Sequence, residues 1–80
     1  MKICSWNINS VRVRVNALDF LIQSYSPDII LLQEIKCENN QFSEFFESSE
    51  YNSIVTGQKG RHGVATLVKK KINFKKIEIS

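Results

Sequence analysis

The 80-residue sequence lacks the features that commonly stabilise a very small protein or attach one to a membrane. Its two cysteines, Cys4 and Cys37, do not form a CxxC pair, and His62 is its single histidine. A disulfide framework and a zinc site are therefore not indicated, and we interpret both cysteines as buried free thiols. No apolar run is long enough for a signal peptide or a membrane span, so we expect a cytoplasmic protein without membrane contacts.

Internal repeats, low-complexity segments and linkers are also absent. With 80 residues, of which 42% are hydrophobic, the chain is at most one small globular domain. A core of this size gives only about 3–5 kcal/mol of stability.

Each part of the chain is poor in charge of one sign, which the overall net charge of +3 conceals. Residues 1–58 carry four basic and seven acidic residues, whereas residues 59–80 carry seven basic residues and one acidic residue. The basic end would suit a polyanion such as nucleic acid. The alternative, which we favour for the lysine runs at 69–71 and 75–76, is a solvated strand edge protected from aggregation by its lysines.

The hydrophobic pattern predicts alternating strands and helices. Residues 2–8 form a short apolar strand, and a helix follows from Val11 to the stop at Pro27, with Asn9 or Ser10 as its cap. Residues 28–34 contain four consecutive apolar residues, the pattern of a strand buried on both faces. A short helix through residues 42–46 and a meander of strands over 51–57, 63–70 and 72–80 complete an α/β fold.

Polar side chains follow the first two predicted strands. Asn7 and Asn9 come after the first, and Gln33 and Glu34 end the second. If the helix between them is a crossover, the strands are parallel and these side chains share one rim of the sheet. A carboxylate with an amide oxygen suits Mg²⁺ or Mn²⁺. Taken alone, an asparagine is more often a turn former or a cap, and a glutamate a solvated charge.

Three segments together resemble the opening third of the exodeoxyribonuclease III and apurinic endonuclease family, within the endonuclease/exonuclease/phosphatase superfamily. They are "KICSWNINSVRVR", "DIILLQEIKC" and "GQKGRHGVATLVKK", and their order and separation match as well as their letters. The resemblance implies a four-layer α/β fold. In it, residues 1–80 would be the amino-terminal portion of a two-sheet β-sandwich flanked by helices, ending before the domain does.

The resemblance also implies roles for individual residues. Asn7 and Glu34 match the family's divalent-metal site and are the expected catalytic and metal-binding residues, with Asn9 and Gln33 orienting them. Arg14 could also face phosphate, although a surface helix charge is the commoner role for it. The expected DNA-binding residues are Arg12, Lys36, Lys59, Gly60, Arg61 and His62.

The sequence departs from the family pattern in ways that affect function. Ile35 replaces a usual threonine, and Ser10 stands where many members have glycine. The family's catalytic tyrosine, its Asp-x-Asn pair and the later aspartate and histidine have no counterparts in these 80 residues, and His62 does not match the catalytic histidine.

The function that the resemblance implies is metal-dependent hydrolysis of DNA phosphodiesters in base-excision repair. Its substrates would be duplex DNA with abasic sites or 3′ ends, and its metal Mg²⁺ or Mn²⁺. We expect the chain to be inactive alone and to need a second chain carrying the missing segment. The alternatives are a non-enzymatic basic nucleic-acid-binding fragment, recognised by salt-dependent but metal-independent DNA affinity, and an inactive split-gene product.

Overall fold

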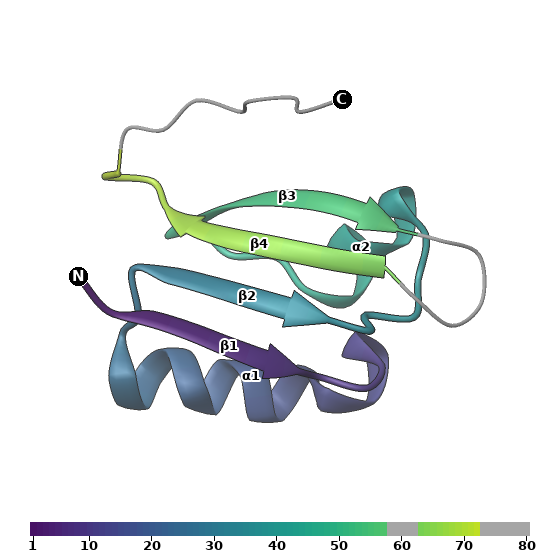
Figure 1. Cartoon of the computed structure of the whole chain (residues 1–80), viewed down its shortest axis with the longest axis horizontal. Helices are drawn as coiled ribbons and strands as arrows, with labels where there is room; N and C mark the ends of the chain where they lie inside the picture. Colours follow the sequence, from purple (N-terminus) through teal and green to yellow (C-terminus); the bar gives the residue numbers. More distant parts are fainter. Residues whose placement is uncertain (58–62, 73–80) are drawn as a thin grey trace.

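The protein is a four-stranded sheet with two helices, seen in a computed structural model that describes residues 1–57 and 63–72. The elements are β1 (Ile3–Asn7), α1 (Val11–Tyr25), β2 (Ile29–Gln33), α2 (Asn39–Phe45), β3 (Tyr51–Gly57) and β4 (Gly63–Lys69). Strands β1 and β2 are parallel and are joined by α1, as the sequence predicts (Figure 1). Neither helix combines the length and the hydropathy that a membrane-spanning helix needs.

The strand order is β1-β2-β4-β3. The described strands β3 and β4 are antiparallel neighbours, as the predicted meander requires, but β2 lies where that meander would place its next strand. Strand β4 pairs antiparallel with both β2 and β3 and thereby takes a central position. The reason lies in the side chains. Ala65 and Leu67 of β4 are buried, whereas Asn52 and Ser53 of β3 are exposed and suit an edge strand. The strand predicted at 72–80 lies almost wholly outside the described residues, and the two-sheet sandwich therefore stays a prediction.

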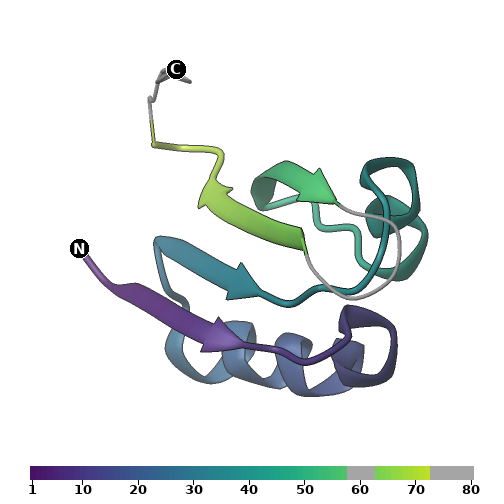
Figure 2. The ribbon, with the colours of Figure 1, turned by 45° about the vertical axis from the view of Figure 1, so that its right-hand side comes forward.

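Both helices cover the same face of the sheet (Figures 1 and 2). Val11 and Leu18 of α1 and Phe42 of α2 are fully or almost fully buried in one core. Alternate residues of the two central strands meet them there, because side chains in a strand alternate between its faces. These strand residues are Ile30, Leu32, Ala65 and Leu67.

The opposite face of the sheet is open over much of its area in the part of the chain that the structure describes, although Val68 near one end of β4 is buried. Leu31 is 37% exposed although it lies in the middle of the apolar run, and Ile29 is only partly buried. The prediction that this strand is buried on both faces is therefore wrong for residues 1–57 and 63–72. An uninterrupted apolar run shows that both faces are apolar, but it does not show what covers them.

Helix α1 ends where proline predicts, but it does not begin with the predicted side-chain cap. At its end, Ser26 adopts a left-handed conformation and donates its N–H to the Ile22 carbonyl at 2.8 Å, directly before Pro27. At its start, Ser10 is the N-cap residue, yet its side chain makes no capping hydrogen bond. The first N–H groups of the helix bond instead to the segment after β2, which brings the two predicted site segments together.

Candidate metal and phosphate site

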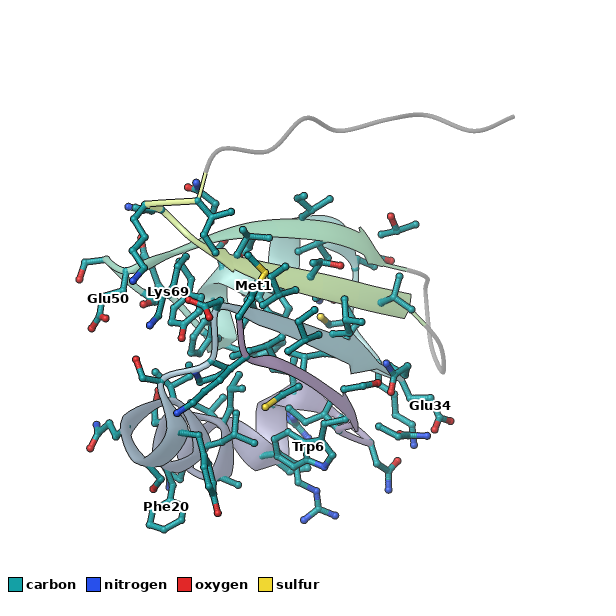
Figure 3. All side chains as sticks on the ribbon, turned by 60° about the vertical axis from the view of Figure 1, so that its left-hand side comes forward. Met1, Trp6, Phe20, Glu34, Glu50 and Lys69 are labelled. Carbon is teal, nitrogen blue, oxygen red and sulfur yellow. The ribbon has the colours of Figure 1, made fainter. Side chains whose placement is uncertain are left out.

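Asn7 and Glu34 meet at the shared carboxyl end of β1 and β2. Asn7 is paired with Gln33 in the parallel register, so Glu34 lies one residue past the last strand pair. The side-chain Nδ2 of Asn7 donates a hydrogen bond to Oε2 of Glu34. Figure 3 shows Glu34 at this end of the sheet. The predicted approach of the two side chains is therefore confirmed, whereas their role as metal ligands stays a prediction.

Three consecutive backbone hydrogen bonds fix this approach. The N–H groups of Ile8, Ser10 and Val11 donate to the carbonyls of Gln33, Glu34 and Ile35 at 3.1, 2.9 and 3.0 Å. The β1–α1 connection is thus joined to the β2 tail beyond the last strand pair. The bonds also satisfy the N–H groups of Ser10 and Val11 at the start of α1.

Two buried isoleucines hold the same two segments in the hydrophobic core. Ile8 and Ile35 are both 0% exposed, and the Ile35 N–H donates to the carbonyl of Gly63 at 3.1 Å. The polar neighbours Asn7 and Asn9 are exposed, and Glu34 is half-buried. Each segment therefore places an apolar residue in the core next to a polar residue at the rim, which holds the polar groups in place at a solvent-accessible site.

Several non-glycine residues around the site have positive φ angles. These are Asn9 at 49°, Ser10 at 83°, Glu34 at 52° and Lys36 at 56°. Such conformations cost of order 1–3 kcal/mol each and persist where the surroundings hold them. Here the hydrogen bond from the Ser10 N–H to the Glu34 carbonyl supplies part of that restraint. Strain concentrated next to paired polar side chains is typical of functional sites.

An open depression of about 630 Å³ lies beside the Asn7–Glu34 pair. It is lined by Trp6, Asn7, Asn9, Arg14, Ala17 and Glu34. Trp6 of β1, labelled in Figure 3, is half-buried and packs against the hydrophobic core. Arg14 anchors its Nε–H on the Ile8 carbonyl at 3.2 Å. The depression thus holds one carboxylate and one guanidinium, each attached to a different part of the rim.

The other residues that the sequence predicts for the site do not all lie at the depression. Asn9 lines the depression as expected. The side-chain amide of Gln33 instead donates to Ser5 Oγ at 3.0 Å and to the Leu31 carbonyl at 3.3 Å, so it does not orient the side chain of Asn7 or Glu34 by these hydrogen bonds. Arg12 and Lys36 are exposed. The predicted DNA-binding residues Lys59, Gly60, Arg61 and His62 lie outside the described residues.

Sequence reasoning gave too little weight to Trp6, Arg14 and Ala17. Arg14 and Ala17 are three residues apart and therefore lie on one side of α1, a spacing that would have grouped them. Nothing in the letters alone shows that this side of the helix faces the carboxyl end of β1. That relation depends on how α1 crosses back over the sheet.

The donor set fits a hard divalent cation in part. Mg²⁺ is commonly held by one or two carboxylates together with waters and substrate phosphates, and Glu34 supplies one such carboxylate. Asn7 could add its amide oxygen if the amide group were turned over, which interchanges oxygen and nitrogen. Among residues 1–57 and 63–72, no group of three or more histidine, cysteine, aspartate or glutamate side chains is arranged to hold a metal.

Elsewhere, both cysteines are free thiols as predicted, but the prediction that both are buried is confirmed only for Cys37. Cys4 and Cys37 are both unpaired, Cys37 is buried, and Cys4 is half-buried. Burial raises the pKa of the Cys37 thiol, which favours its neutral form.

Comparison with known proteins places this geometry in a family. Residues 4–79 match the model of the endonuclease/exonuclease/phosphatase family. Exodeoxyribonuclease III of Haemophilus influenzae is 46% identical over 70 residues, which are 86% of this chain and 26% of the relative. A DNA-(apurinic or apyrimidinic site) endonuclease of Dictyostelium discoideum is 36% identical over 76 residues, covering 91% of this chain and 21% of the relative.

Solved structures agree with the fold. A Neisseria 3′ phosphatase bound to a product DNA hairpin matches 85% of this chain and 27% of its own with a TM-score of 0.78 and 35% identity. An AP endonuclease of Archaeoglobus fulgidus matches 85% of this chain and 27% of its own with a TM-score of 0.77 and 36% identity. The chain spans about a quarter of the length of these relatives. With nearly all of its residues matched by the family model, the chain belongs to the endonuclease/exonuclease/phosphatase family.

Proposed function

We propose that this chain supplies the metal-binding part of a nuclease that hydrolyses DNA phosphodiesters in DNA repair, at abasic sites or 3′ ends. The observation that carries the proposal is the Asn7–Glu34 pair, held by three backbone bonds at the end of two parallel strands. The relatives support the substrate class, because they are named as an exodeoxyribonuclease, apurinic-site endonucleases and a 3′ phosphatase with product DNA.

Glu34 would hold Mg²⁺ or Mn²⁺, and Asn7 would add an amide oxygen or orient the carboxylate. The chemistry that such an ion supplies is neutralisation of negative charge on the phosphate. Asn9 would contribute a polar group to the rim of the same depression. The residues that the family uses to activate water are absent from the 80 residues, so we propose that cleavage requires a second polypeptide segment.

Metal binding can be tested on the chain itself. We expect Mn²⁺ to broaden the backbone NMR signals of Asn7, Asn9 and Glu34 first, because paramagnetic relaxation falls steeply with distance. Glu34→Gln keeps the size of the side chain and removes its charge, so the broadening should need at least about tenfold more Mn²⁺. Glu44→Gln is the matched control, since Glu44 is an exposed glutamate of α2.

Activity is tested in a chimera in which this chain replaces the matching stretch of the Haemophilus relative. We expect Mg²⁺-dependent incision of a duplex with one abasic site, with Glu34→Gln losing most of the turnover and Glu44→Gln retaining it. A chimera that binds this DNA and incises it equally well with Glu34→Gln would show that Glu34 is only a solvated rim charge.

A further inference from the structure

We infer that Arg14 is a phosphate-binding residue of the depression, distinct from Arg12 and from the lysines at the other end of the sheet. The inference rests on the proposed function, because it takes the ligand to be a DNA backbone phosphate next to the Asn7–Glu34 pair. It assigns a second, anion-binding element to the site: Glu34 for the cation and Arg14 for the phosphate oxygens.

The lining of the depression singles out Arg14. Of the six described residues that form it, Arg14 alone carries a positive charge. Two of the backbone donors that could otherwise attract an anion at the start of α1 are already engaged, because Ser10 and Val11 donate to the carbonyls of Glu34 and Ile35. A phosphate in this depression would therefore find its positive partner in the Arg14 side chain.

The attachment of Arg14 prepares the guanidinium for such a contact. Its Nε–H bonds to the carbonyl of Ile8, whose own N–H bonds to Gln33 at 3.1 Å. This contact uses one of the five N–H donors of the guanidinium and restrains the side chain at the Nε atom. The remaining donors lie on the two terminal nitrogens, which suit paired bonds to phosphate oxygens. A restrained arginine also loses less side-chain entropy on binding than a mobile one.

The contrast with Arg12 makes the inference specific. Arg12 lies two residues earlier on the same helix and carries the same charge, but residues two apart on a helix do not face the same way. Both arginines are exposed, but only Arg14 lines the depression and donates its Nε–H to the Ile8 carbonyl. Lys70 gives a second comparison, because it lies past the carboxyl end of β4, at the end of the sheet opposite to Glu34.

The test measures the affinity of the 80-residue chain for a fluorescent DNA duplex that carries one abasic-site analogue. EDTA is present to remove metal ions, and protein and DNA are altered singly and together. Single phosphates near the analogue are replaced in turn by uncharged methylphosphonates. For the wild-type chain we expect the replacement at one phosphate position to weaken binding of the duplex about tenfold. Arg14→Gln should weaken binding of the unmodified duplex by a similar factor, reduce the salt slope by about 0.9 and show no further loss at that position.

Arg12→Gln and Lys70→Gln are the controls, and both should retain the full loss at that methylphosphonate position. Arg14→Lys preserves the charge but not the planar, forked arrangement of N–H donors. It should therefore restore the salt slope of the wild-type chain but only part of its DNA affinity. In NMR spectra of wild type, the Arg14 Nε–H signal should be protected from exchange before DNA is added, which a freely solvated arginine would not show.

Three outcomes would overturn the inference. The first is an equal loss of DNA affinity for Arg14→Gln and Lys70→Gln. The second is a methylphosphonate position whose effect disappears with Arg12→Gln instead of Arg14→Gln. The third is that the wild-type chain does not bind the duplex at low salt. Because no metal is present, failure here leaves the Glu34 experiments untouched. Failure of those experiments likewise leaves the Arg14 cycle interpretable.

Discussion

Ser10 has a backbone conformation that glycine would adopt more easily. Its φ is 83° and its ψ is 104°, a region that a side chain disfavours. Ser10→Gly should therefore raise the free energy of unfolding by up to about 1 kcal/mol, the relieved strain being partly offset by the greater entropy of glycine in the unfolded chain. Urea unfolding followed by circular dichroism measures the change.

Ser24→Gly is the control for that change, because Ser24 lies in the last turn of α1. There glycine should lower stability by about 0.5 kcal/mol, because serine is the better helix former. If both substitutions destabilised the chain equally, the conformation assigned to Ser10 would be wrong. The same angles also give a physical reason for glycine at this position in many members of the family.

Asp28 makes stability depend on pH at the opposite end of the sheet. Its Oδ2 accepts the backbone N–H of Lys2 at 2.8 Å, and chiefly this bond holds the Asp28 pKa below its usual value near 3.8. A carboxyl whose pKa is lower in the folded state stabilises the fold above its unfolded pKa. That contribution is lost as the pH falls through the folded pKa.

Asp28→Asn should therefore make stability less dependent on pH below about pH 4, where the wild-type chain loses this contribution. Thermal unfolding at a series of pH values measures the slope. Asp19→Asn, on the exposed side of α1, removes a carboxylate without removing the Lys2 bond and is the control. An unchanged slope for Asp28→Asn alone would contradict the assigned role.

At the scale of elements, Phe42 is the most deeply buried aromatic residue of α2. Phe42 is 1% exposed and meets Phe46 edge to face, with ring centroids 6.1 Å apart. Phe42→Ala should cost about 3–5 kcal/mol. Since that matches the whole stability expected of a core this small, cooperative unfolding should be lost. Phe20→Ala is the control, because Phe20 is 71% exposed on α1, and it should change stability by at most about 0.5 kcal/mol.

Element types were readable from local signals, but their arrangement was not. The helix from Val11 to Tyr25 follows from apolar spacing and Pro27, and the strand at 51–57 was predicted to the residue. The position of β4 between β2 and β3 was missed, because strand pairing depends on contacts distant in sequence. The cap of α2 was also missed, although Glu38 and Gln41 form a reciprocal capping box with the right spacing.

The candidate site shows the same division. The meeting of Asn7 and Glu34 follows from two parallel strands joined by one helix, so the sequence could predict it. The backbone bonds that hold Glu34 with a positive φ could not be predicted, because nothing in a glutamate indicates that conformation. The contact of Arg14 with Ile8 depends on the path of α1 and was likewise not readable.

For the molecule as a whole, we expect no cleavage of abasic-site DNA by the purified 80-residue chain in Mg²⁺. Groups that activate water and groups that stabilise charge act as a unit, and a part of such a set retains little of the effect. A gel assay with Glu34→Ala as the nuclease-contamination control measures this. Incision by wild type that disappears with Glu34→Ala would show that fewer residues are needed than we propose.

The open face of the sheet gives the whole chain a tendency to associate. In the described residues both helices lie on the other face, while Ile3, Leu31 and Val64 are 59%, 37% and 49% exposed. Exposed apolar sheet surface of this kind favours contact between copies of a chain.

The double substitution Leu31→Thr and Val64→Thr should lower the weight-average mass measured by sedimentation velocity at high concentration. Threonine keeps the preference for strand while adding a hydroxyl group. Phe20→Ser removes an even more exposed apolar side chain from α1 and is the matched control. Association that falls as much with Phe20→Ser as with the double substitution would show that general hydrophobicity, and not this face, brings the chains together.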